Sequence, residues 1–193
     1  MCPVCGRFFD GAGESHLCGS CAVSAPSFSR HRSAGRYRDL LKDSILLLKY
    51  RKYRPLAAVL GRMAHESLRG EEDLWRGVDL IVPVPLHKKR RRERGFNQSE
   101  EIGREIGKLA RIPVVRNALR KIRNTPPQTS LEHRERADNV RGAYIVDRKS
   151  VIEGKVVLLV DDVYTTGSTL GECARTLRRE GAADVRAVTV AQA

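Results

Sequence analysis

The chain has 193 residues, which is enough for one ordinary domain with a small appendage and too few for two full-sized domains. Hydrophobic residues make up 41% and charged residues 31%, with only 8 Pro and 16 Gly, which excludes a low-complexity or collagen-like chain and predicts a globular fold. The formal net charge of +13 favours phosphate-rich partners such as nucleotides or nucleic acid.

The sequence carries no signal for a membrane. It has no run of about 18 uncharged apolar residues, the length that a membrane-spanning helix requires. Its first residues also lack the charged and then apolar segments of an export signal. We therefore expect no membrane span and a cytoplasmic location.

Four of the five cysteines lie in the first 22 residues, as two Cys-x-x-Cys pairs: Cys2, Cys5, Cys18 and Cys21. Each pair makes a tight turn that points two sulfurs at one ion, and the glycines between the pairs let the second turn close a tetrahedron. This spacing predicts a structural zinc site in a small knuckle. An iron–sulfur cluster is the alternative, and His16 could replace one cysteine as a ligand. In a reducing cytoplasm disulfides are disfavoured.

The segment 36–69 predicts two helices, because apolar residues recur at helical spacing on both sides of Pro55. Tyr50 and Tyr53 alternate with Lys and Arg residues over 49–54. Such a mixture could stack on nucleic-acid bases or simply cover a helix end, and the second interpretation is favoured.

Two segments are strongly basic. Residues 30–54 contain nine Lys and Arg against Asp39 and Asp43, and residues 88–94 place six cations around Glu93. A solvated face that keeps the protein soluble is the plain interpretation of such runs. The second run follows an apolar strand, where a role in phosphate binding is a better explanation.

From residue 78 onward, apolar strands alternate with amphipathic helices. The strands are expected at 78–84, 156–160 and 185–190, and the helices at 99–109 and 168–180. Uninterrupted apolar strands are buried on both faces, so the pattern predicts an α/β fold with a largely parallel sheet flanked by helices.

The sequence shows no internal repeat. Its expected organisation has three parts: a four-cysteine zinc-binding knuckle (1–25), a basic helical region (26–76) and a core (77–193). A polar, basic connection between about 117 and 140 is long for a compact domain. Connections of this length are usually lids or binding loops.

The most informative segment runs from Val156 to Leu170. A buried strand delivers Asp161 and Asp162 to the edge of the sheet where open α/β folds bind ligands, and both side chains are expected to be exposed there. A hydroxyl-rich turn with one glycine then enters a helix, whose N-terminal N–H groups suit a phosphate. The carboxylates would repel a phosphate but suit a cis-diol, or a cation that bridges to that diol, so the segment predicts a ribose 5-phosphate pocket.

Three alternatives are weaker. The strand ending in two acids is also typical of P-loop nucleotide hydrolases, but the chain has no G-x4-G-K-[ST] segment. A dinucleotide fold would need G-x-G-x-x-G after an early strand, and the sequence contains none. A purely structural interpretation makes Thr169 and Glu172 a capping box at the start of the helix.

The segment VLLVDDVYTTGSTL closely resembles the phosphoribosyl pyrophosphate signature of type I phosphoribosyltransferases. Together with the four-cysteine knuckle, the LKY of the helical region, VPVPLHKKRRRERGFNQSE and RNTPPQTSLEHRERADNVRGAY, the chain is similar over nearly its full length to the ComF family of competence-associated proteins. The resemblance implies a phosphoribosyltransferase core and a donor bound with Mg²⁺.

The resemblance also implies residue roles. Asp161 and Asp162 would contact the ribose hydroxyls as the catalytic pair. The 5-phosphate would lie on Thr165, Thr166, Gly167, Ser168 and Thr169. Pyrophosphate would lie on Pro85, Leu86, His87, Lys88 and Lys89, with Arg90 nearby. A mobile loop from Arg120 to Gln128, with Arg120, Lys121 and Arg123, would close over the site.

Three classes of function follow: a phosphoribosyltransferase with an unknown acceptor, a competence factor that binds single-stranded DNA, and a nucleotide-sensing regulator. The intact acid pair and phosphate turn favour a functional ligand pocket, because a pure DNA-binding protein has no use for them. The basic helical region keeps the second class open. The resemblance implies the competence machinery as a further partner, whereas the acceptor and the oligomeric state are not indicated by the residues.

Overall fold

The computed structural model describes residues 1–9, 14–125 and 139–193. The elements follow in chain order as α1 (Gly19–Val23), β1 (Arg30–Arg36), α2 (Asp39–Tyr50), α3 (Pro55–Leu68), α4 (Glu72–Trp75), β2 (Leu80–Pro83), α5 (Lys88–Arg94), α6 (Gln98–Ala110), β3 (Leu119–Lys121), β4 (Tyr144–Val146), α8 (Lys149–Ile152), β5 (Val156–Tyr164), α9 (Ser168–Arg179) and β6 (Asp184–Gln192). None of the helices described is long and apolar enough to cross a membrane.

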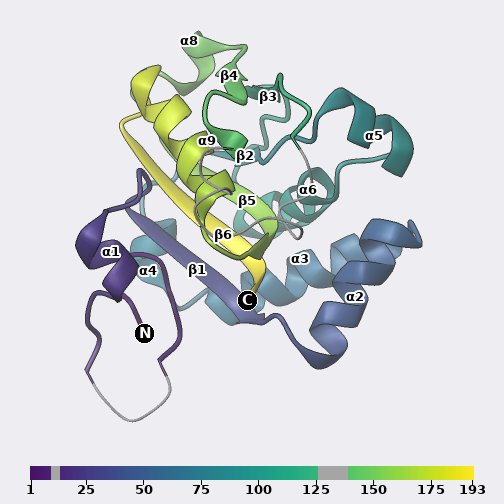
Figure 1. Cartoon of the computed structure of the whole chain (residues 1–193), viewed down its shortest axis with the longest axis horizontal. Coiled ribbons are helices and arrows are strands. Elements are labelled where there is room, and N and C mark those ends of the chain that lie inside the picture. The colour runs from purple at the N-terminus through teal and green to yellow at the C-terminus, as the bar shows by residue number, and fades with distance from the viewer. Residues whose placement is uncertain (10–13, 126–138) are drawn as a thin grey trace.

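The centre of the molecule is a four-stranded sheet in the order β1-β6-β5-β2, with every neighbouring pair parallel (Figure 1). Parallel strands need crossover connections, and helices supply them here. The predicted parallel α/β sheet is therefore confirmed. A second, two-stranded antiparallel sheet joins β3 to β4.

Strand β5 explains why the sheet is covered on both faces. Successive residues of a strand point to opposite sides. Val157 and Leu159 lie in a core cluster with α9, whereas Leu158 and Val160 lie in a second cluster with α2, α3 and α6. All four side chains are fully buried, as expected for a continuous apolar strand in a three-layer fold.

Strand β1 is the main departure from the sequence expectation, which makes 26–76 a helical region. It lies at the edge of the central sheet and pairs with β6. Its sequence, RHRSAGR, has no apolar run. The buried side chains are His31, Arg32 and Ser33, which are stabilised by hydrogen bonds to other segments, so hydropathy could not reveal the strand. The division into three parts stays a prediction.

The four-cysteine segment packs directly against this edge of the sheet. The backbone N–H of His31 donates to the carbonyl of Val4 at 2.7 Å, so the segment satisfies part of the outer edge of β1. Gly6 has a φ of +66°, and a Cβ atom there would lie 2.7 Å from the His31 carbonyl oxygen. Only glycine allows this close approach. The cysteines belong to the same core cluster as Phe28 and Tyr164.

Candidate functional site

The two acids of β5 point to opposite sides of the strand, as the alternation of a strand requires. Asp162 is buried, and its Oδ1 lies 2.8 Å from the Nζ of Lys49 on α2. Asp161 is half-buried, and its Oδ1 accepts a hydrogen bond of 2.7 Å from the Ser99 hydroxyl at the start of α6. The expectation that both acids are exposed is therefore wrong for Asp162, because the helical region folds over it.

The surroundings of the acid pair shift the pKa values of Asp161 and Lys49. Burial and the neighbouring charge of Asp162 raise the pKa of Asp161 to about 7, although the Ser99 hydroxyl and Lys49 oppose the shift. Burial by itself would lower the pKa of Lys49, but the charge and hydrogen bond of Asp162 raise it above its ordinary value. Near neutral pH, Lys49 is therefore a cation, and Asp161 can gain or lose a proton.

The hydroxyl-rich turn joins β5 to α9. The Thr166 and Ser168 hydroxyls are 2.8 Å apart, and the Ser168 N–H donates to the Thr166 hydroxyl at 3.4 Å. Gly167 is the residue before α9 and has a φ of +80°. A Cβ atom there would lie 2.4 Å from the Tyr164 Oη, so the turn requires glycine.

The capping-box interpretation of this helix start is wrong. The N-cap residue is Gly167, which has no side chain to cap the helix, and the hydroxyl of Thr169 bonds Tyr144. The Glu172 carboxylate instead accepts from the Gly142 N–H at 2.6 Å and from Arg175. The Glu172 carboxylate therefore does not cap the first N–H groups of α9.

A cavity of about 570 Å³ lies at the carboxyl ends of the central strands. It is lined by residues from several segments that are far apart in the sequence: Tyr37, Lys49, Tyr50, Val84, Pro85, Leu86, Arg90, Arg94, Gln98, Lys121, Thr125, Tyr144, Asp161, Asp162, Val163, Thr165, Thr166, Thr169 and Ala193. Three predicted groups therefore meet in one cavity, namely the acid pair, the hydroxyls of the turn and part of the loop after β2. Gly167 and Ser168 support the turn without lining the cavity.

The loop after β2 divides between two cavities. Pro85 and Leu86 line both the main cavity and a smaller neighbouring one of about 310 Å³, whereas His87 and Lys88 line the neighbour. Lys89 lines neither of these two cavities; its backbone N–H donates to the His87 ring at 3.3 Å. The structure thus brings two of the five residues predicted for pyrophosphate to the acid pair.

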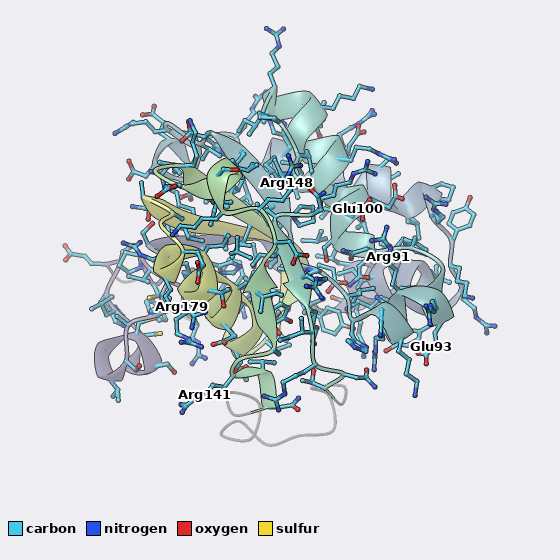
Figure 2. All side chains as sticks on the ribbon, turned by 90° about the horizontal axis from the view of Figure 1, so that it is seen from above. Arg91, Glu93, Glu100, Arg141, Arg148 and Arg179 are labelled. Carbon is cyan, nitrogen blue, oxygen red and sulfur yellow. The ribbon has the colours of Figure 1, made fainter. Side chains whose placement is uncertain are left out.

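Helix α5 supplies Arg90, which the sequence analysis expects near the pyrophosphate, and a second cation, Arg94, which it does not assign. Arg90 and Arg94 line the main cavity, and Arg94 is buried and donates to the Gln98 side chain. Residues four apart share one face of a helix, so this spacing is the signal that could have identified Arg94. Arg91 lies on another side of α5 and pairs with Glu100 at 3.5 Å; Figure 2 labels both residues.

The residues predicted for a closing loop also divide. Lys121, on β3, lines the main cavity, and burial lowers its pKa. Arg120 points to the smaller cavity and forms two hydrogen bonds with Asp147, at 2.7 and 3.0 Å. Arg123 donates to the Arg141 carbonyl at 2.6 Å. The end of the predicted loop, residues 126–128, lies outside the described residues.

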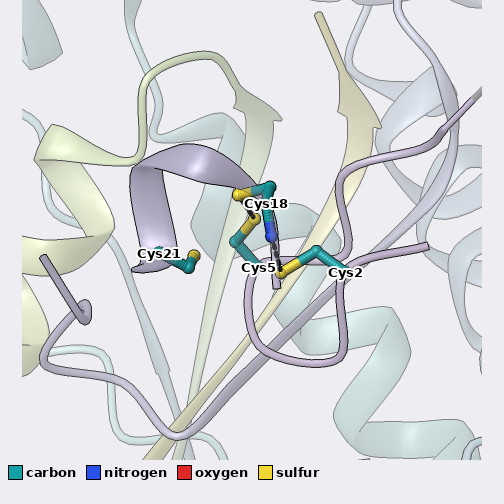
Figure 3. Close-up of side chains that lie close together, drawn as sticks. All are labelled: Cys2, Cys5, Cys18 and Cys21. Atoms are coloured by element: carbon teal, nitrogen blue, oxygen red, sulfur yellow. Dashed lines mark hydrogen bonds between the residues drawn. The ribbon is translucent and has the colours of Figure 1, made fainter. Parts of the chain in front are cut away.

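The four predicted metal ligands form one buried cluster on the other side of Tyr164. The thiols of Cys2, Cys5, Cys18 and Cys21 all lie within 4.8 Å of one another (Figure 3). The sulfurs of Cys5 and Cys18 are 3.5 Å apart. Four thiolates around one Zn²⁺, with Zn–S bonds of about 2.3 Å, place their sulfurs about 3.8 Å from each other. The donor set therefore fits a tetrahedral ion that prefers sulfur.

The backbone of the knuckle already favours thiolates. Burial by itself would raise the pKa of Cys2, but N–H groups of the turns, that of Cys18 first, lower it to about 6. The Cys18 N–H lies 3.5 Å from the Cys2 sulfur. Burial raises the pKa of Cys5 to about 11, so full ionisation of the set requires a cation. His16 instead stacks on Phe9, with ring centroids 4.1 Å apart.

His31 connects this cluster to the cavity side of the sheet. Burial lowers its pKa to about 4, so the ring is neutral. Its Nδ1 lies 2.7 Å from the Cys5 carbonyl, which can only accept, so Nδ1 carries the proton and Nε2 faces the Thr189 hydroxyl as the acceptor. The ring stacks on Tyr164, with centroids 4.2 Å apart. Tyr164 directly precedes the hydroxyl-rich turn.

Comparisons with known proteins agree with this geometry. A family described as "Phosphoribosyl transferase domain" matches residues 95–193. The DNA utilization protein YhgH of Escherichia coli is 33% identical over 189 residues, which cover 96% of this chain and 81% of that protein. Competence protein ComFC of Bacillus subtilis is 28% identical over 199 residues, covering 98% of this chain and 77% of that protein.

A solved structure is also similar, at 23% identity and a TM-score of 0.46. It is a glutamine phosphoribosylpyrophosphate amidotransferase from B. subtilis complexed with ADP and GMP. The match covers 69% of this chain and 25% of that one.

Proposed function

This chain belongs to the ComF family of competence-associated proteins with a phosphoribosyltransferase domain, and on that premise we propose that its cavity binds phosphoribosyl pyrophosphate together with Mg²⁺. The protein would then transfer or sense phosphoribosyl groups. One observation carries the proposal: the acid pair, the hydroxyls of the turn and several cations line a single cavity.

The turn before α9 is the proposed site of the 5-phosphate. Thr165, Thr166 and Thr169 line the cavity, and the N–H groups of the first turn of α9 lie beside them. Helix N-termini favour anions because their N–H groups lack intrahelical acceptors and carry the positive end of the helix dipole. Gly167 permits the turn to fold tightly against Tyr164.

The acid pair is the proposed site of the ribose hydroxyls. The Oδ2 atom of Asp162 is buried and has no hydrogen-bond partner in the part of the chain that the structure describes. Buried polar atoms are usually satisfied, so an orphaned carboxylate oxygen in a cavity wall suits a ligand hydroxyl that donates to it. A carboxylate beside the sugar would also stabilise the positive charge that develops on it during transfer.

The pyrophosphate would lie between the loop at Pro85 and the cations Arg90 and Lys121, which line the same cavity. Transfer breaks the bond from the anomeric carbon to the pyrophosphate oxygen, which leaves with the electron pair, and forms a bond from that carbon to the acceptor. Mg²⁺ would supply charge neutralisation on the leaving pyrophosphate. Because Lys49 and Ser99 already occupy one oxygen of each acid, we place the ion with the phosphates.

We further propose zinc in the four-cysteine cluster, with a structural role. Four thiolates complete a tetrahedral shell and leave no position for a substrate. Their donor set, their burial and their separation within 4.8 Å support this assignment.

Titration calorimetry with phosphoribosyl pyrophosphate and Mg²⁺ tests the proposed site. We expect saturable heat with the wild type and strongly weakened binding for the double variant Asp161→Asn, Asp162→Asn. Glu93→Gln is the control for a lost negative charge, because Glu93 is exposed on α5 and outside the lining of the cavity. Absence of heat with the wild type, or equal affinity in the double variant, would overturn the proposal.

Release of pyrophosphate distinguishes a transferase from a sensor. If a base or amine in a screen of acceptors causes the release of pyrophosphate from the donor, the protein is a transferase. Saturable binding without release under every acceptor identifies a sensor.

Binding of single-stranded DNA is the second candidate function, because the helical region exposes two tyrosines among cations. Tyr50 and Tyr53 are 64% and 58% exposed, and Arg51 and Lys52 beside them are exposed as well. Bases stack on such rings while cations contact phosphates. The affinity should fall steeply with salt, and charge reversal at Arg51 and Lys52 should reduce the slope of that fall. An affinity that barely changes with salt would leave this face a solvated surface.

A further inference from the structure

Lys49 is the residue through which the helical region reaches the acid pair. It is the penultimate residue of α2, and its ammonium lies 2.8 Å from Oδ1 of Asp162. The two side chains are 18% and 5% exposed. Both line the main cavity, and Tyr50, the next residue of α2, lines it too.

The ion pair is too buried to be an incidental surface contact. Exposed ion pairs contribute little to stability, whereas a buried charge needs a partner because desolvation is costly. Arg94, from α5, is the other cation whose charge acts on Asp162. It already donates to Gln98, so Lys49 is the direct partner of the carboxylate.

The pair also leaves Asp162 asymmetric. Lys49 occupies Oδ1, while Oδ2 is buried and has no partner among the described residues. A purely structural ion pair would gain from satisfying both oxygens, since an unmet buried acceptor costs free energy. The arrangement instead orients the carboxylate and keeps one oxygen available on the wall of the cavity.

We propose that Lys49 is a positioning residue for the sugar of the ligand: it holds the Asp162 carboxylate in one orientation, so that Oδ2 accepts a hydrogen bond from a ribose hydroxyl. This inference rests on the proposed function. It makes α2 part of the donor site, although α2 precedes the phosphoribosyltransferase domain match at 95–193. The same helix carries Tyr50, so the segment that positions the acid also shapes the wall beside it.

The test compares two probes that differ in whether they carry the sugar. Lys49→Met should weaken the binding of ribose 5-phosphate, measured by calorimetry, roughly 10- to 100-fold, as expected for loss of a charge-assisted partner. The binding of inorganic phosphate, which has no sugar hydroxyl to donate to Asp162, should change by less than about threefold. Lys49→Arg should restore most of the affinity for ribose 5-phosphate, because the guanidinium keeps a charged donor.

Lys42→Met is the matched control, because Lys42 is an exposed cation of the same helix and does not line the cavity. It should leave both affinities unchanged. A double-mutant cycle with Asp162→Asn adds a second criterion: once Asp162 is neutral, Lys49→Met should cost little further affinity for ribose 5-phosphate. If Lys49→Met fails to fold, Lys49→Leu replaces it, since leucine likewise cannot donate to the carboxylate.

The outcomes separate this inference from the proposed function. If the wild type binds neither phosphoribosyl pyrophosphate nor ribose 5-phosphate, the proposed function fails. If the wild type binds and Lys49→Met binds ribose 5-phosphate equally well, only the role of Lys49 is overturned. An equal loss for ribose 5-phosphate and inorganic phosphate would likewise overturn it, by showing that Lys49 acts on the fold or the overall charge.

Discussion

The cysteine knuckle and the main cavity bury polar groups in opposite ways. In the knuckle, four thiols converge within 4.8 Å of one another as a closed set for one ion. In the cavity, carboxylates, hydroxyls and cations line an open space of about 570 Å³, and one carboxylate oxygen has no partner among the described residues. A closed set suits a permanent structural role, whereas an incomplete set suits a ligand that comes and goes.

The two regions nevertheless share one support. His31 bonds the Cys5 carbonyl and stacks on Tyr164, and the Tyr164 ring lies next to Gly167 in the hydroxyl-rich turn. A change in the knuckle can therefore reach the turn through two aromatic rings. Substitutions in each region measure how far its stability and binding depend on its own residues.

The largest effect is expected for Cys18→Ser. Structural zinc contributes on the order of 10 kcal/mol to the folding of small zinc domains, and three thiolates hold the ion far less tightly than four. We expect metal analysis of the purified variant to show a loss of bound zinc and a lower melting temperature. Cys173→Ala is the control, because this buried thiol lies on α9 outside the cluster, and it should retain the metal. Full metal content in Cys18→Ser would refute the proposed site.

The acid pair should respond unequally to neutralisation. Asp162→Asn leaves the buried ammonium of Lys49 without a counter-charge, which typically costs about 3 kcal/mol or more of the free energy of unfolding. Asp161→Asn removes a half-buried acid whose pKa burial has already raised to about 7, so it should cost much less. Urea unfolding of the two variants measures the difference. Equal destabilisation would show that the Lys49 pair does not distinguish them.

Substitution of Gly167 tests how closely the turn packs against Tyr164. Gly167→Ala imposes a φ of +80° on a residue with a Cβ atom that would lie 2.4 Å from the Tyr164 Oη, and such strain costs about 1–3 kcal/mol. The substitution should also weaken the binding of ribose 5-phosphate, as measured by calorimetry. Gly171→Ala, one turn into α9, meets no atom within 4 Å and should be neutral or slightly stabilising. A Gly167→Ala variant with wild-type stability and affinity would contradict the close packing of the turn.

The effect of pH is the most gradual one, because it is spread over several pH units. The pKa of Asp161 is about 7 in the folded protein and about 4 in the unfolded chain, so the folded state binds the proton more tightly. Its contribution to stability is complete below about pH 4 and is lost as the pH rises through about 7. Urea unfolding at several pH values should show a shallower decline over this range in Asp161→Asn than in the wild type. Parallel profiles would exclude Asp161 as the titrating group.

Much of the core could be predicted because its signals are local. The run from Val156 to Val160 has no polar residue, and only a strand buried on both faces accommodates it, as the structure confirms. The strand is longer than expected, however: it continues through the acid pair to Tyr164, so Asp161 lies within it. Two Cys-x-x-Cys pairs likewise indicate a cluster, since each tight turn presents both of its sulfurs to one point.

Other features depend on contacts between distant segments. Strand β1 is polar, and it is a strand because β6 and the knuckle satisfy its backbone and its buried side chains. Asp162 is buried because Lys49, 113 residues earlier in the chain, covers it with a charge of opposite sign. Arg94 lines the cavity because α5 turns it inward, although the sequence alone does not distinguish it from the other arginines of α5.

The sequence by itself therefore determined which chemistry this protein carries: a parallel sheet, a carboxylate pair before a hydroxyl turn, and four thiols in two turns. Only the tertiary structure decided which acid is buried, which cations reach it and that the knuckle packs against the sheet beside the cavity. The physical reason is that hydropathy and turn patterns act within a few residues, whereas the desolvation of a charge depends on whatever distant segment folds over it.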